Sequence, residues 1–447
     1  MGTWNNAEGQ MKKHLLLLML ALAVTAPWIS PPVSRAGEVR QIRLWSDQSE
    51  PWQQKVISAM VQDFQSSHPT IKVEVEYISW QDRQAKMTAA LAAQDVPEVA
   101  LLSSQYATSL PATGALRTLD DVVKDLGGAD AFLGASLSLA RYDGHFFSLP
   151  YSTIPVVMWY RKDRFDENGL KPPKTLDELV ATAKVLAEKG KGKYYALGTA
   201  FGRGEYTDET FSTLALWPMG GSVFDDKMKV AFNRPVTVKA LEYYKSLYPF
   251  TPPGSETWEY ADTMKSYVSG SVAMVIYYGR VLKNLEEYNP DILGKTGAFL
   301  PPKDKYQRTV NPPQSIGVFK KSKYPEEGVE FLKFFLTSKH YVQFLWSTPG
   351  HSLPTLKSKV EEWRQHELLK KYPEILDVLL KASEPEIGFS PTKEPGVPVA
   401  SPAWQAIRGA RVLPDAVQKV TLKNENPQEV AEWAQKEIEK IVEKFKM

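Results

Sequence analysis

The sequence has no cysteine among its 447 residues. The chain therefore cannot form a disulfide bond, hold zinc through thiolates or carry a lipid on an N-terminal cysteine. Histidine is scarce as well: the six histidines, at positions 14, 68, 145, 340, 351 and 366, show neither an HExxH motif nor another spacing typical of metal ligands. We therefore expect no metal site and no other cofactor.

An excess of charge of one sign is also missing. The 54 basic and 52 acidic side chains leave a formal net charge of +2, and no basic block stands out. Nucleic acid and anionic membranes are therefore poor partners. The GxxxxGK[ST], GxGxxG and GxSxG motifs of phosphate-binding and acyl-transfer enzymes are absent too.

A long apolar run occurs near the N-terminus, at residues 15–26, directly after two lysines and a histidine. It is too short for an anchored transmembrane helix. The small residues Ser34 and Ala36 favour cleavage after Ala36, so residues 1–36 are predicted to be a signal peptide, with Met11 as a second candidate start. An amphipathic helix packed on the fold is the alternative, but the run has no polar face. The sequence thus predicts an exported, soluble protein of the periplasm or the extracellular space, without a cysteine-linked lipid anchor.

The size and composition of the chain indicate more than one lobe. A chain of 447 residues, 43% hydrophobic and 11% aromatic, is too large for one ordinary core. Strand patterns at 42–45, 71–78 and 98–102 alternate with helical spacing at 56–64 and near 82–94. This alternation predicts an α/β fold with largely parallel sheets, in which ligands lie beyond the carboxyl ends of the strands.

The stretch YDGHFFSLPYSTIPVVMWYRKDRF, residues 142–165, contains two strand patterns separated by prolines. Pro150 and Pro155 mark strand edges, because proline withholds an N–H group from the sheet ladder. Residues 151–154 form a short extended piece, and residues 156–160 have the pattern of a buried strand. The two strands could belong to two different sheets or form one bent strand, and the stretch alone leaves both open.

Nine stretches of the mature chain follow one another in the order found in a known family. They are LWSDQSE, FQSSHPTIKVEVEYISW, AALAAQDVPEVALL, YDGHFFSLPYSTIPVVMWYRKDRF, GLKPPKTLDELVATAKVL, YVSGSVAMVIYYGR, GAFLPP, EEGVEFLKFFLTSKHYVQFL and SPAWQAIRGA. On these stretches the chain resembles the extracellular solute-binding proteins of carbohydrate ABC importers (family 1, maltose-binding-protein-like). It departs at Glu98, where aspartate is usual, at Ser271, where lysine is common, and at Arg280, near a frequent tryptophan. The last departure bears on ligand choice.

The resemblance implies a two-lobed periplasmic-binding-protein fold, each lobe a mostly parallel sheet flanked by helices. Closure of the lobes about hinge strands would capture a sugar or oligosaccharide for delivery to the permease subunits in the membrane. The protein would act as a monomer and not as an enzyme. The expected division is lobe one at 37–149 and 312–350, lobe two at 151–309 and 351–447, and hinge segments near 150–155 and 310–315.

Two segments near the C-terminus have patterns of their own. The proline-rich stretch 385–402 is expected to be an ordered loop along the cleft edge and not a strand. Residues 426–447 are expected to form a helix with one apolar side that packs on lobe two.

A sugar presents apolar C–H faces and a rim of hydroxyls, so its site needs aromatic planes together with carboxylates, amides and arginines. Such side chains follow the first and third predicted strands: Asp47, Gln48, Glu50, Ser103, Gln105 and Tyr106. The hinge stretch adds Tyr151, and the glycine-framed loop 200–210 adds Arg203 and Glu205. Across the cleft, the resemblance points to Trp217, Tyr277, Tyr278, Arg280 and Trp404.

Many of these candidates have a structural alternative. Asp47 and Glu50 precede a predicted helix and could cap it. Trp217 lies next to a proline and a glycine pair and could close a turn in the core, whereas we expect Trp404 to project into the cleft. The remaining candidates with such an alternative could simply face solvent: Gln105, Tyr106, Arg203 and Glu205.

Two other functions remain open at this point. The same fold could bind an anionic solute such as a glycerol phosphodiester, with Arg280 and Arg203 clamping the charged group. A secreted glycoside hydrolase would need two carboxylates flanking the scissile bond, which sequence spacing alone does not exclude. The agreement of nearly the whole chain with a binding-protein plan disfavours the hydrolase.

Overall fold

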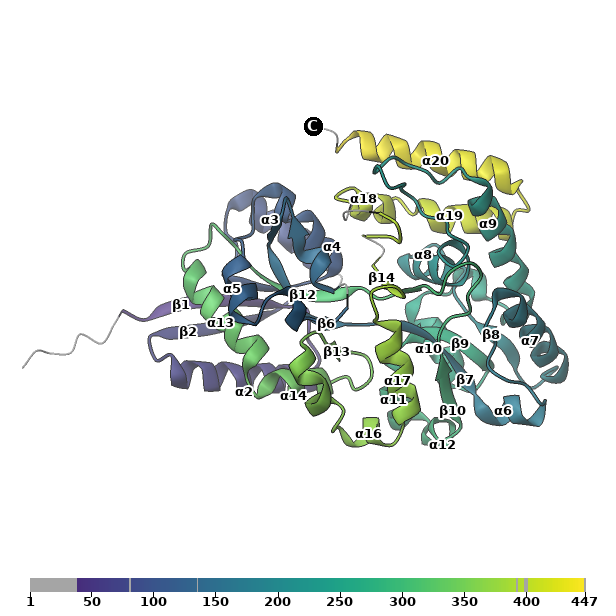
Figure 1. Cartoon of the computed structure of the whole chain (residues 1–447), viewed down its shortest axis with the longest axis horizontal. Helices are drawn as coiled ribbons and strands as arrows, with labels where there is room; N and C mark the ends of the chain where they lie inside the picture. The colour runs from purple at the N-terminus through teal and green to yellow at the C-terminus, as the bar shows by residue number, and fades with distance from the viewer. Residues whose placement is uncertain (1–37, 80–81, 135, 391–392, 398–400, 446–447) are drawn as a thin grey trace, which may run out of the picture. The chain divides into compact units, whose positions relative to one another are not determined.

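The computed structural model describes residues 38–79, 82–134, 136–390, 393–397 and 401–445. The predicted signal peptide, residues 1–36, lies outside these ranges. Arg40–Met447 form one unit that contains two larger sheets flanked by helices (Figure 1). Within the described ranges, no helix has both the length and the apolar character that crossing a bilayer requires.

The first sheet has six strands in the order β13-β6-β12-β3-β1-β2. The pairs β1–β2 and β1–β3 are parallel, as expected for strands that alternate with helices. The pairs β12–β3, β12–β6 and β13–β6 are antiparallel. The bounds are β1 (Arg40–Ser46), β2 (Ile71–Tyr77), β3 (Val99–Leu102), β6 (Ser148–Thr153), β12 (Pro313–Val318) and β13 (Leu353–Pro354).

The connection from β1 to β2 shows how the local sequence specifies this lobe. Pro51 occupies the first position of helix α2 (Pro51–Ser67), where a missing N–H group leaves no hydrogen bond unmade. The apolar side chains at helical spacing, Ile57 and Phe64 among them, are buried. The ring centroid of Phe64 lies 5.1 Å from that of Phe331, which comes much later in the sequence. Helix α2 therefore packs on the helix that follows β12.

The second sheet has four strands in the order β10-β7-β9-β8. Strands β8 and β9 are parallel, whereas β7 runs antiparallel to both β9 and β10. All seven residues of β9 are buried, in keeping with its continuous apolar run. The bounds are β7 (Val156–Arg161), β8 (Tyr195–Gly198), β9 (Val272–Tyr278) and β10 (Thr296–Phe299).

Both sheets are therefore mixed and not mostly parallel as expected. The reason lies in the strands that connect the lobes. β12 begins beside the end of β3, and β7 begins beside the end of β9. Each connecting strand therefore runs antiparallel to that neighbour. The alternating pattern at 42–102 predicts the parallel part only, because the connecting strands come from outside that pattern.

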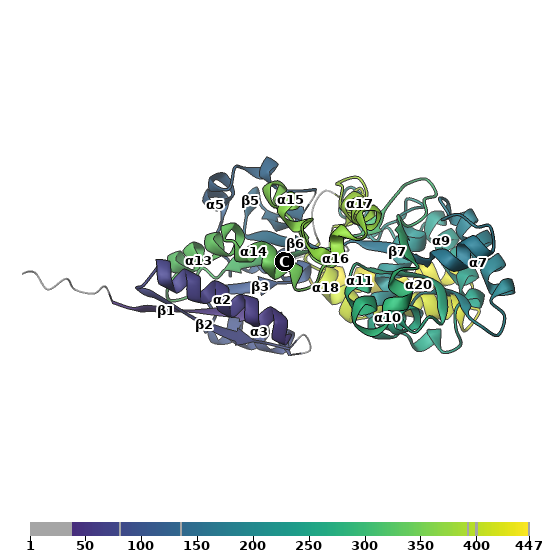
Figure 2. The same cartoon turned by 90° about the horizontal axis from the view of Figure 1, so that it is seen from below.

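The two strands around Pro150 and Pro155 belong to different sheets. β6 lies in the first sheet and β7 in the second, and only Ile154 and Pro155 separate them (Figure 2). The segment 150–155 thus connects the lobes. A second connection leads from β10 through β11 (Thr309–Val310) into β12, and a third follows β13, since helix α17 (Pro373–Ala382) packs on β7 and β10.

The first sheet extends beyond the expected boundary at residue 350. Leu353 and Pro354 form β13 and pair with Thr153 and Ser152 of β6. Gly350 adopts a φ of 81°, which permits the sharp turn that returns the chain to this strand. Sheet pairing therefore assigns 353–354 to the first lobe, although they were expected in the second.

The proline-rich stretch contains a short strand that the sequence did not predict. Gly388 and Phe389 form β14, which pairs in parallel with β11. Thr309 N donates to Ile387 O at 2.8 Å, and Asn311 N donates to Phe389 O at 2.6 Å. The expectation of a loop without a strand is wrong at these two residues, because the partner strand lies nearly 80 positions earlier in the chain and leaves no local signal.

Helices cover the two sheets and fill the connections between them. Those beside the first sheet are α2, α3 (Arg83–Ala93), α4 (Ser104–Ser109), α5 (Asp120–Asp125), α13 (Pro325–Thr337) and α14 (His340–Trp346). Those beside the second are α6 (Lys162–Glu167), α7 (Leu176–Lys189), α8 (Glu205–Phe211), α9 (Pro235–Leu247), α10 (Tyr260–Val268), α11 (Val281–Tyr288), α12 (Pro290–Leu293) and α17. The short helices α15 (Val360–Trp363) and α16 (Glu367–Lys370) lie between β13 and α17.

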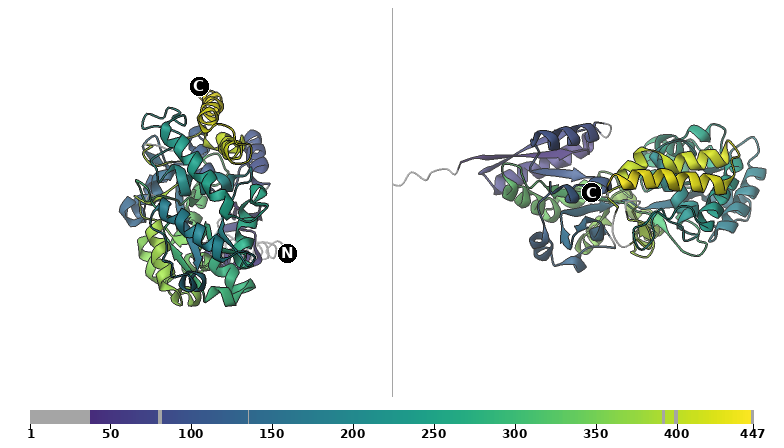
Figure 3. Two further views of the ribbon diagram at one scale, coloured as in Figure 1. Left: turned by 90° about the vertical axis from the view of Figure 1, so that its right-hand side faces the viewer. Right: turned by 90° about the horizontal axis from the view of Figure 1, so that it is seen from above.

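The C-terminal helices pack on the second lobe, as expected. Helices α18 (Trp404–Gly409), α19 (Val412–Thr421) and α20 (Pro427–Glu443) follow the proline-rich stretch. α19 and α20 run side by side, in yellow in Figure 3, and both contact α9. The buried residues Val430 and Ile438 lie on the apolar side that the sequence predicted for α20.

Candidate ligand-binding site

Two sheet edges meet at the connecting strands. In the first sheet, β1, β3 and β6 end and β12 begins at one edge. In the second sheet, β8 and β9 end and β7 begins at one edge. Because β6 and β7 follow one another so closely, these edges face each other across the connection, where open α/β sheets bind ligands.

Asp47 lies at the end of β1 and is held by two side chains. Its Oδ1 accepts a hydrogen bond from Gln48 Nε2 at 2.7 Å, and its Oδ2 accepts one from Arg83 Nη1 at 3.2 Å. The Asp47 side chain is only 6% exposed. Burial lowers the pKa of Arg83, and the neighbouring Asp47 carboxylate opposes this shift. Sequence reasoning missed Arg83, whose only signal is its place at the start of the helix after β2.

Gln48 and Glu50 belong to the start of helix α2. Gln53 Nε2 donates to Gln48 Oε1 at 2.7 Å, and Glu50 N donates to Gln53 Oε1 at 3.2 Å. Glu50 is the N-cap residue of α2 and is exposed. Its position thus agrees with the capping role that the sequence left as an alternative.

Ser103, Gln105 and Tyr106 lie at the end of β3 and in helix α4. The Ser103 hydroxyl is buried and has no hydrogen-bond partner among the described residues. Gln105 is partly buried, and the Tyr106 hydroxyl is buried without a hydrogen-bond partner among the described residues. A cavity of about 20 Å³ lies between Asp47, Ser103 and Tyr106, enough for about one water molecule and not for a sugar.

Tyr151 lies inside the first lobe. Its ring centroid is 5.7 Å from those of Phe335 and Phe344, and its carbonyl accepts a hydrogen bond from Tyr341 Oη at 2.7 Å. The side chain is buried. Tyr151 therefore fixes the hinge strand to the core behind it.

Arg203 and Glu205 lie near the start of helix α8. Arg203 makes two hydrogen bonds to the Asp415 carboxylate of α19, at 2.5 and 2.8 Å, and its side chain is 58% exposed. Glu205 Oε2 lies 3.3 Å from Arg408 Nη2. Burial has the largest effect on the pKa of Arg83 and lowers it, whereas the charge of Glu205, in the other lobe, raises it.

Arg408 of α18 is the centre of a buried charge cluster. Its side chain is 4% exposed and lies 2.8 Å from Glu209 and 3.5 Å from Asp208. Burial raises the pKa of Asp208 and of Glu209, and Arg408 opposes both shifts. Burial alone would lower the pKa of Arg408, but the surrounding carboxylates raise it. Arg408 was also missed, although it follows Trp404 by four residues and so lies on the same face of the helix.

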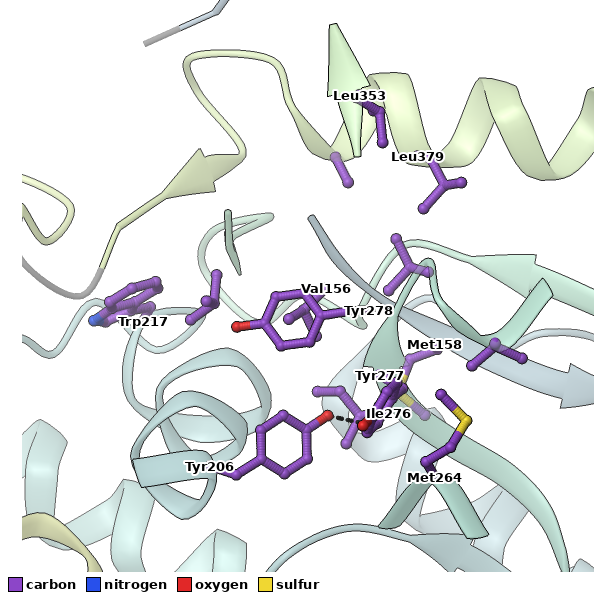
Figure 4. Packing of buried hydrophobic residues seen from close by; sticks show 14 of the residues in the cluster. Val156, Met158, Tyr206, Trp217, Met264, Ile276, Tyr277, Tyr278, Leu353 and Leu379 are labelled. Carbon is purple, nitrogen blue, oxygen red and sulfur yellow. Dashed lines mark hydrogen bonds between the residues drawn. The ribbon is translucent and has the colours of Figure 1, made fainter. Parts of the chain in front are cut away.

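Tyr277 and Tyr278 end β9 and are buried beneath the sheet edge. Tyr277 Oη donates to Tyr260 O at 2.9 Å, and Tyr278 Oη donates to Glu209 Oε2 at 2.5 Å. Figure 4 shows Tyr278 beside this core, where the Tyr206 hydroxyl donates to Ile276 O at 2.8 Å. The two tyrosines link β9 to α8 and α10.

Trp217 and Trp404 are both enclosed by the second lobe. Trp217 is 0% exposed, and its Nε1 donates to Glu394 Oε1 at 3.1 Å. Trp404 is 1% exposed, and its ring centroid lies 6.3 Å from that of Phe224. Its Nε1 has no hydrogen-bond partner among the described residues. The structure thus places both rings in the core.

Arg280 stands at the start of helix α11, directly beyond β9. Its Nε is buried and has no hydrogen-bond partner within the described ranges, and the same holds for Nδ1 of the neighbouring His351. Burial lowers the pKa of His351 well below its usual value, and the charge of Arg280 adds to this effect. His351 is therefore a neutral imidazole beside the guanidinium.

The larger cavity of this region has a volume of about 260 Å³ and lies at the second lobe connection. Ser136 and Ser138 line it from the 3-10 helix at 136–140 of the first lobe. Asn311 and Pro313 line it from the connecting strand. The rest of the lining comes from the proline-rich stretch: Pro385, Gly388, Phe389, Ser390, Lys393, Glu394, Gly396 and Val397. None of the ligand-binding residues proposed from the sequence appears in this lining, although Asn311 and Pro313 belong to the predicted hinge segment 310–315.

The chain matches the family of bacterial extracellular solute-binding proteins over residues 45–341, about two thirds of its length. It belongs to this family. Its fold matches an ABC transporter solute-binding protein from Thermotoga lettingae TMO bound with alpha-D-tagatose, with a TM-score of 0.75 at 22% identity, covering 90% of this chain and 99% of that chain. It also matches maltose-bound MalE3 of T. maritima, with a TM-score of 0.73 at 18% identity, covering 90% and 99% of the two chains.

Among curated proteins, the diacetylchitobiose binding protein DasA of Streptomyces coelicolor is 26% identical over 324 residues, 68% of this chain and 71% of that protein. The family, the two-lobed fold and the role as an extracellular solute-binding protein are thereby confirmed.

Proposed function

We propose that the protein captures a sugar or a short oligosaccharide outside the membrane, closes its lobes over it and delivers it to the permease subunits of an ABC importer. It acts as a soluble monomer, without a cysteine-linked lipid anchor or enzyme activity of its own. The observation that carries this proposal is the cavity of about 260 Å³ whose walls come from the first lobe, the connecting strand and the second lobe.

The lining of this cavity has the chemistry that a sugar requires. Hydroxyls come from Ser136, Ser138 and Ser390, an amide comes from Asn311, and Phe389 contributes an aromatic ring. Because Asn311 belongs to the lobe connection, a ligand in this cavity contacts the segment that bends when the lobes rotate. Ligand binding and lobe closure are thereby coupled.

The polar side chains at the facing sheet edges are proposed to complete the site. On the first lobe these are Asp47, Gln48, Ser103, Gln105 and Tyr106, and on the second Glu205 and Arg280. Five enclosed aromatic side chains support these edges from behind: Tyr151, Trp217, Tyr277, Tyr278 and Trp404. Arg203 is bound by the Asp415 carboxylate, and Glu50 is bound at the start of α2.

The cavity supports binding and not hydrolysis. Among the described residues that line it, Glu394 is the only carboxylate, whereas glycoside hydrolysis needs a pair. The Glu394 carboxylate already accepts hydrogen bonds from Trp217 Nε1, Val223 N and Phe224 N. Incubation with oligosaccharides should therefore release no reducing ends.

Filling the cavity tests the proposal. Isothermal titration of a panel of mono- and disaccharides against the wild type should identify a bound sugar, and a ligand at 100 times its dissociation constant should raise stability by about 2.7 kcal/mol. Ser138→Trp should weaken that sugar at least tenfold because the indole occupies the cavity. Ser246→Trp, at an exposed position of α9, is the matched control and should bind normally. A panel without any binding sugar would refute the proposal, and unchanged binding by Ser138→Trp would remove this cavity from it.

A further inference from the structure

Lys393 is the one basic side chain among the described residues that line the cavity. It is partly buried, and within the described ranges its ammonium group has no hydrogen-bond acceptor, carboxylate partner or stacked ring; its backbone N–H alone is engaged, by Ser390 O at 3.0 Å. Burial lowers the pKa of Lys393, and no acid among the described residues opposes the shift. A partly buried cation thus lies in the cavity wall without a counter-ion among the described residues.

The adjacent Glu394 does not supply that counter-ion. Its Oε1 and Oε2 accept hydrogen bonds from Val223 N at 3.1 and 2.8 Å, and Oε1 also accepts the Trp217 indole N–H at 3.1 Å. The charge that acts on Glu394 is that of Arg234. The carboxylate is therefore already engaged by Trp217 and Val223, although Glu394 lines the cavity beside Lys393.

A second cation lies behind the aromatic wall. The Arg308 guanidinium carbon is 5.7 Å from the ring centroid of Phe389 and 3.8 Å from that of Tyr306. Its one hydrogen bond among the described residues goes to Trp217 O at 3.4 Å, so Arg308 has no carboxylate partner there either. Both cations around Phe389 therefore add positive potential to the cavity.

We propose that the sugar captured in this cavity carries an acidic group, a carboxylate or a phosphate, and that Lys393 binds this group. The inference rests on the proposed sugar-binding function and narrows its substrate class. An anionic group would give the partly buried ammonium the partner that the described residues do not provide, and a charge-assisted hydrogen bond of this kind is stronger than one to a neutral hydroxyl. A neutral sugar would leave the charge uncompensated.

The residues that the sequence suggested for an anionic solute are placed differently. Arg203 is held by the Asp415 carboxylate of α19, so its charge is already neutralised. Arg280 lies beyond β9 and does not line the cavity. The assignment of the anion contact therefore moves to Lys393, in the proline-rich stretch.

Matched pairs of neutral and acidic sugars test the inference by titration calorimetry. D-glucose and D-galactose are compared with D-glucuronate and D-galacturonate for a carboxylate, and with glucose 6-phosphate for a phosphate. One acidic member should bind at least tenfold more tightly than its neutral counterpart, and the preference should fall as salt rises from 20 to 500 mM because screening weakens charge pairing. The better of the two acidic arms identifies which anion the site takes.

Substitution of Lys393 separates this inference from the proposed function. Lys393→Gln should abolish the acidic preference, Lys393→Arg should retain most of it, and Lys381→Gln, at an exposed position of α17, should leave it unchanged. Tighter binding of the neutral sugars, or a full acidic preference in a folded Lys393→Gln, would overturn the inference and leave sugar binding intact. Failure of every neutral and acidic sugar to bind the wild type would refute the proposed function and the inference together.

Discussion

The side chains of Thr153 and Asn311 join the two connecting strands. The Thr153 hydroxyl donates a hydrogen bond to Asn311 Oδ1, and both side chains are buried. Asn311 also binds the proline-rich stretch, through its N–H group to Phe389 O at 2.6 Å, and lines the 260 Å³ cavity. Asn311 therefore belongs both to the lobe connection and to the cavity wall, so a contact made in the cavity acts directly on the hinge.

Thr153→Val should destabilise the protein by about 1–3 kcal/mol, because it removes the donor and leaves a buried acceptor unpaired. Urea unfolding measures the loss. The matched control is Thr337→Val, at an exposed position where the hydroxyl bonds only to Lys333 O of its own helix, and it should change stability by about 0.5 kcal/mol or less. Equal stability of the two variants would show that the Thr153 hydroxyl contributes nothing to the hinge.

Gly279→Ala should disturb the contact between the lobes beside the hinge. A Cβ atom on Gly279 would lie 1.6 Å from Gly350 O, so the β9–α11 turn and the turn before β13 touch backbone to backbone. We expect a loss of about 1–3 kcal/mol from this overpacking. Gly294→Ala is the control, because its Cβ would meet nothing within 4 Å.

Small-angle scattering shows whether the same contact governs closure. The wild type should give a smaller radius of gyration with its sugar than without it, and Gly279→Ala should reduce this difference, since the two turns can no longer approach as closely. A wild-type radius that saturating sugar leaves unchanged would contradict closure and favour a preformed pocket.

Much of the fold is predictable because its signals are local. Alternating apolar residues specify β2, helical spacing and Pro51 specify α2, and Pro150 with Pro155 marks the passage from β6 to β7. Each of these features depends on side chains within one or two turns of the chain. The resemblance then joined these elements into two lobes, which no local pattern could do.

The candidate site was less predictable because its partners are remote in sequence. Asp47 was found, but its partner Arg83 lies in the helix after β2. The sequence left Trp217 open between a sugar platform and a core residue, and its indole is bound by Glu394, 177 positions later. A tryptophan beside a glycine turn has the same local pattern whether it faces a cleft or a core. Lys393 lies in a stretch whose prolines predicted only a loop, so its role became visible through the cavity alone.

The buried Glu394 should make stability depend on pH. Burial raises the pKa of Glu394 from 4.5 to about 7, despite the N–H groups that bind it. Between these values the folded protein holds a proton that the unfolded chain has lost, so stability is greatest below pH 4.5 and falls by up to about 3 kcal/mol as pH rises to 7. Urea unfolding from pH 4.5 to 8 should show a smaller decline for Glu394→Gln than for the wild type. Parallel profiles would contradict the assignment.

The exported protein should begin at Gly37 or within a few residues of it, because Ser34 and Ala36 offer the small side chains that signal peptidases accept. N-terminal sequencing of secreted material decides the point. A mature chain that still contains residues 15–26 would indicate a membrane anchor instead.

Trp404→Ala should mainly cost folding stability. With the ring enclosed beside Phe224, its removal leaves a large void, and we expect a loss of about 3–5 kcal/mol, with sugar affinity affected only indirectly. Trp404→Phe should recover part of the loss because it refills much of the volume. Urea unfolding measures the stability of both variants, and titration calorimetry below their unfolding transitions measures binding.

The sequence had suggested instead that the Trp404 ring stacks on the sugar, in which case truncation should weaken binding by about 1–3 kcal/mol and leave stability nearly unchanged. A stable Trp404→Ala protein with lost affinity would therefore return Trp404 to the site and require the lobe to expose it when sugar binds.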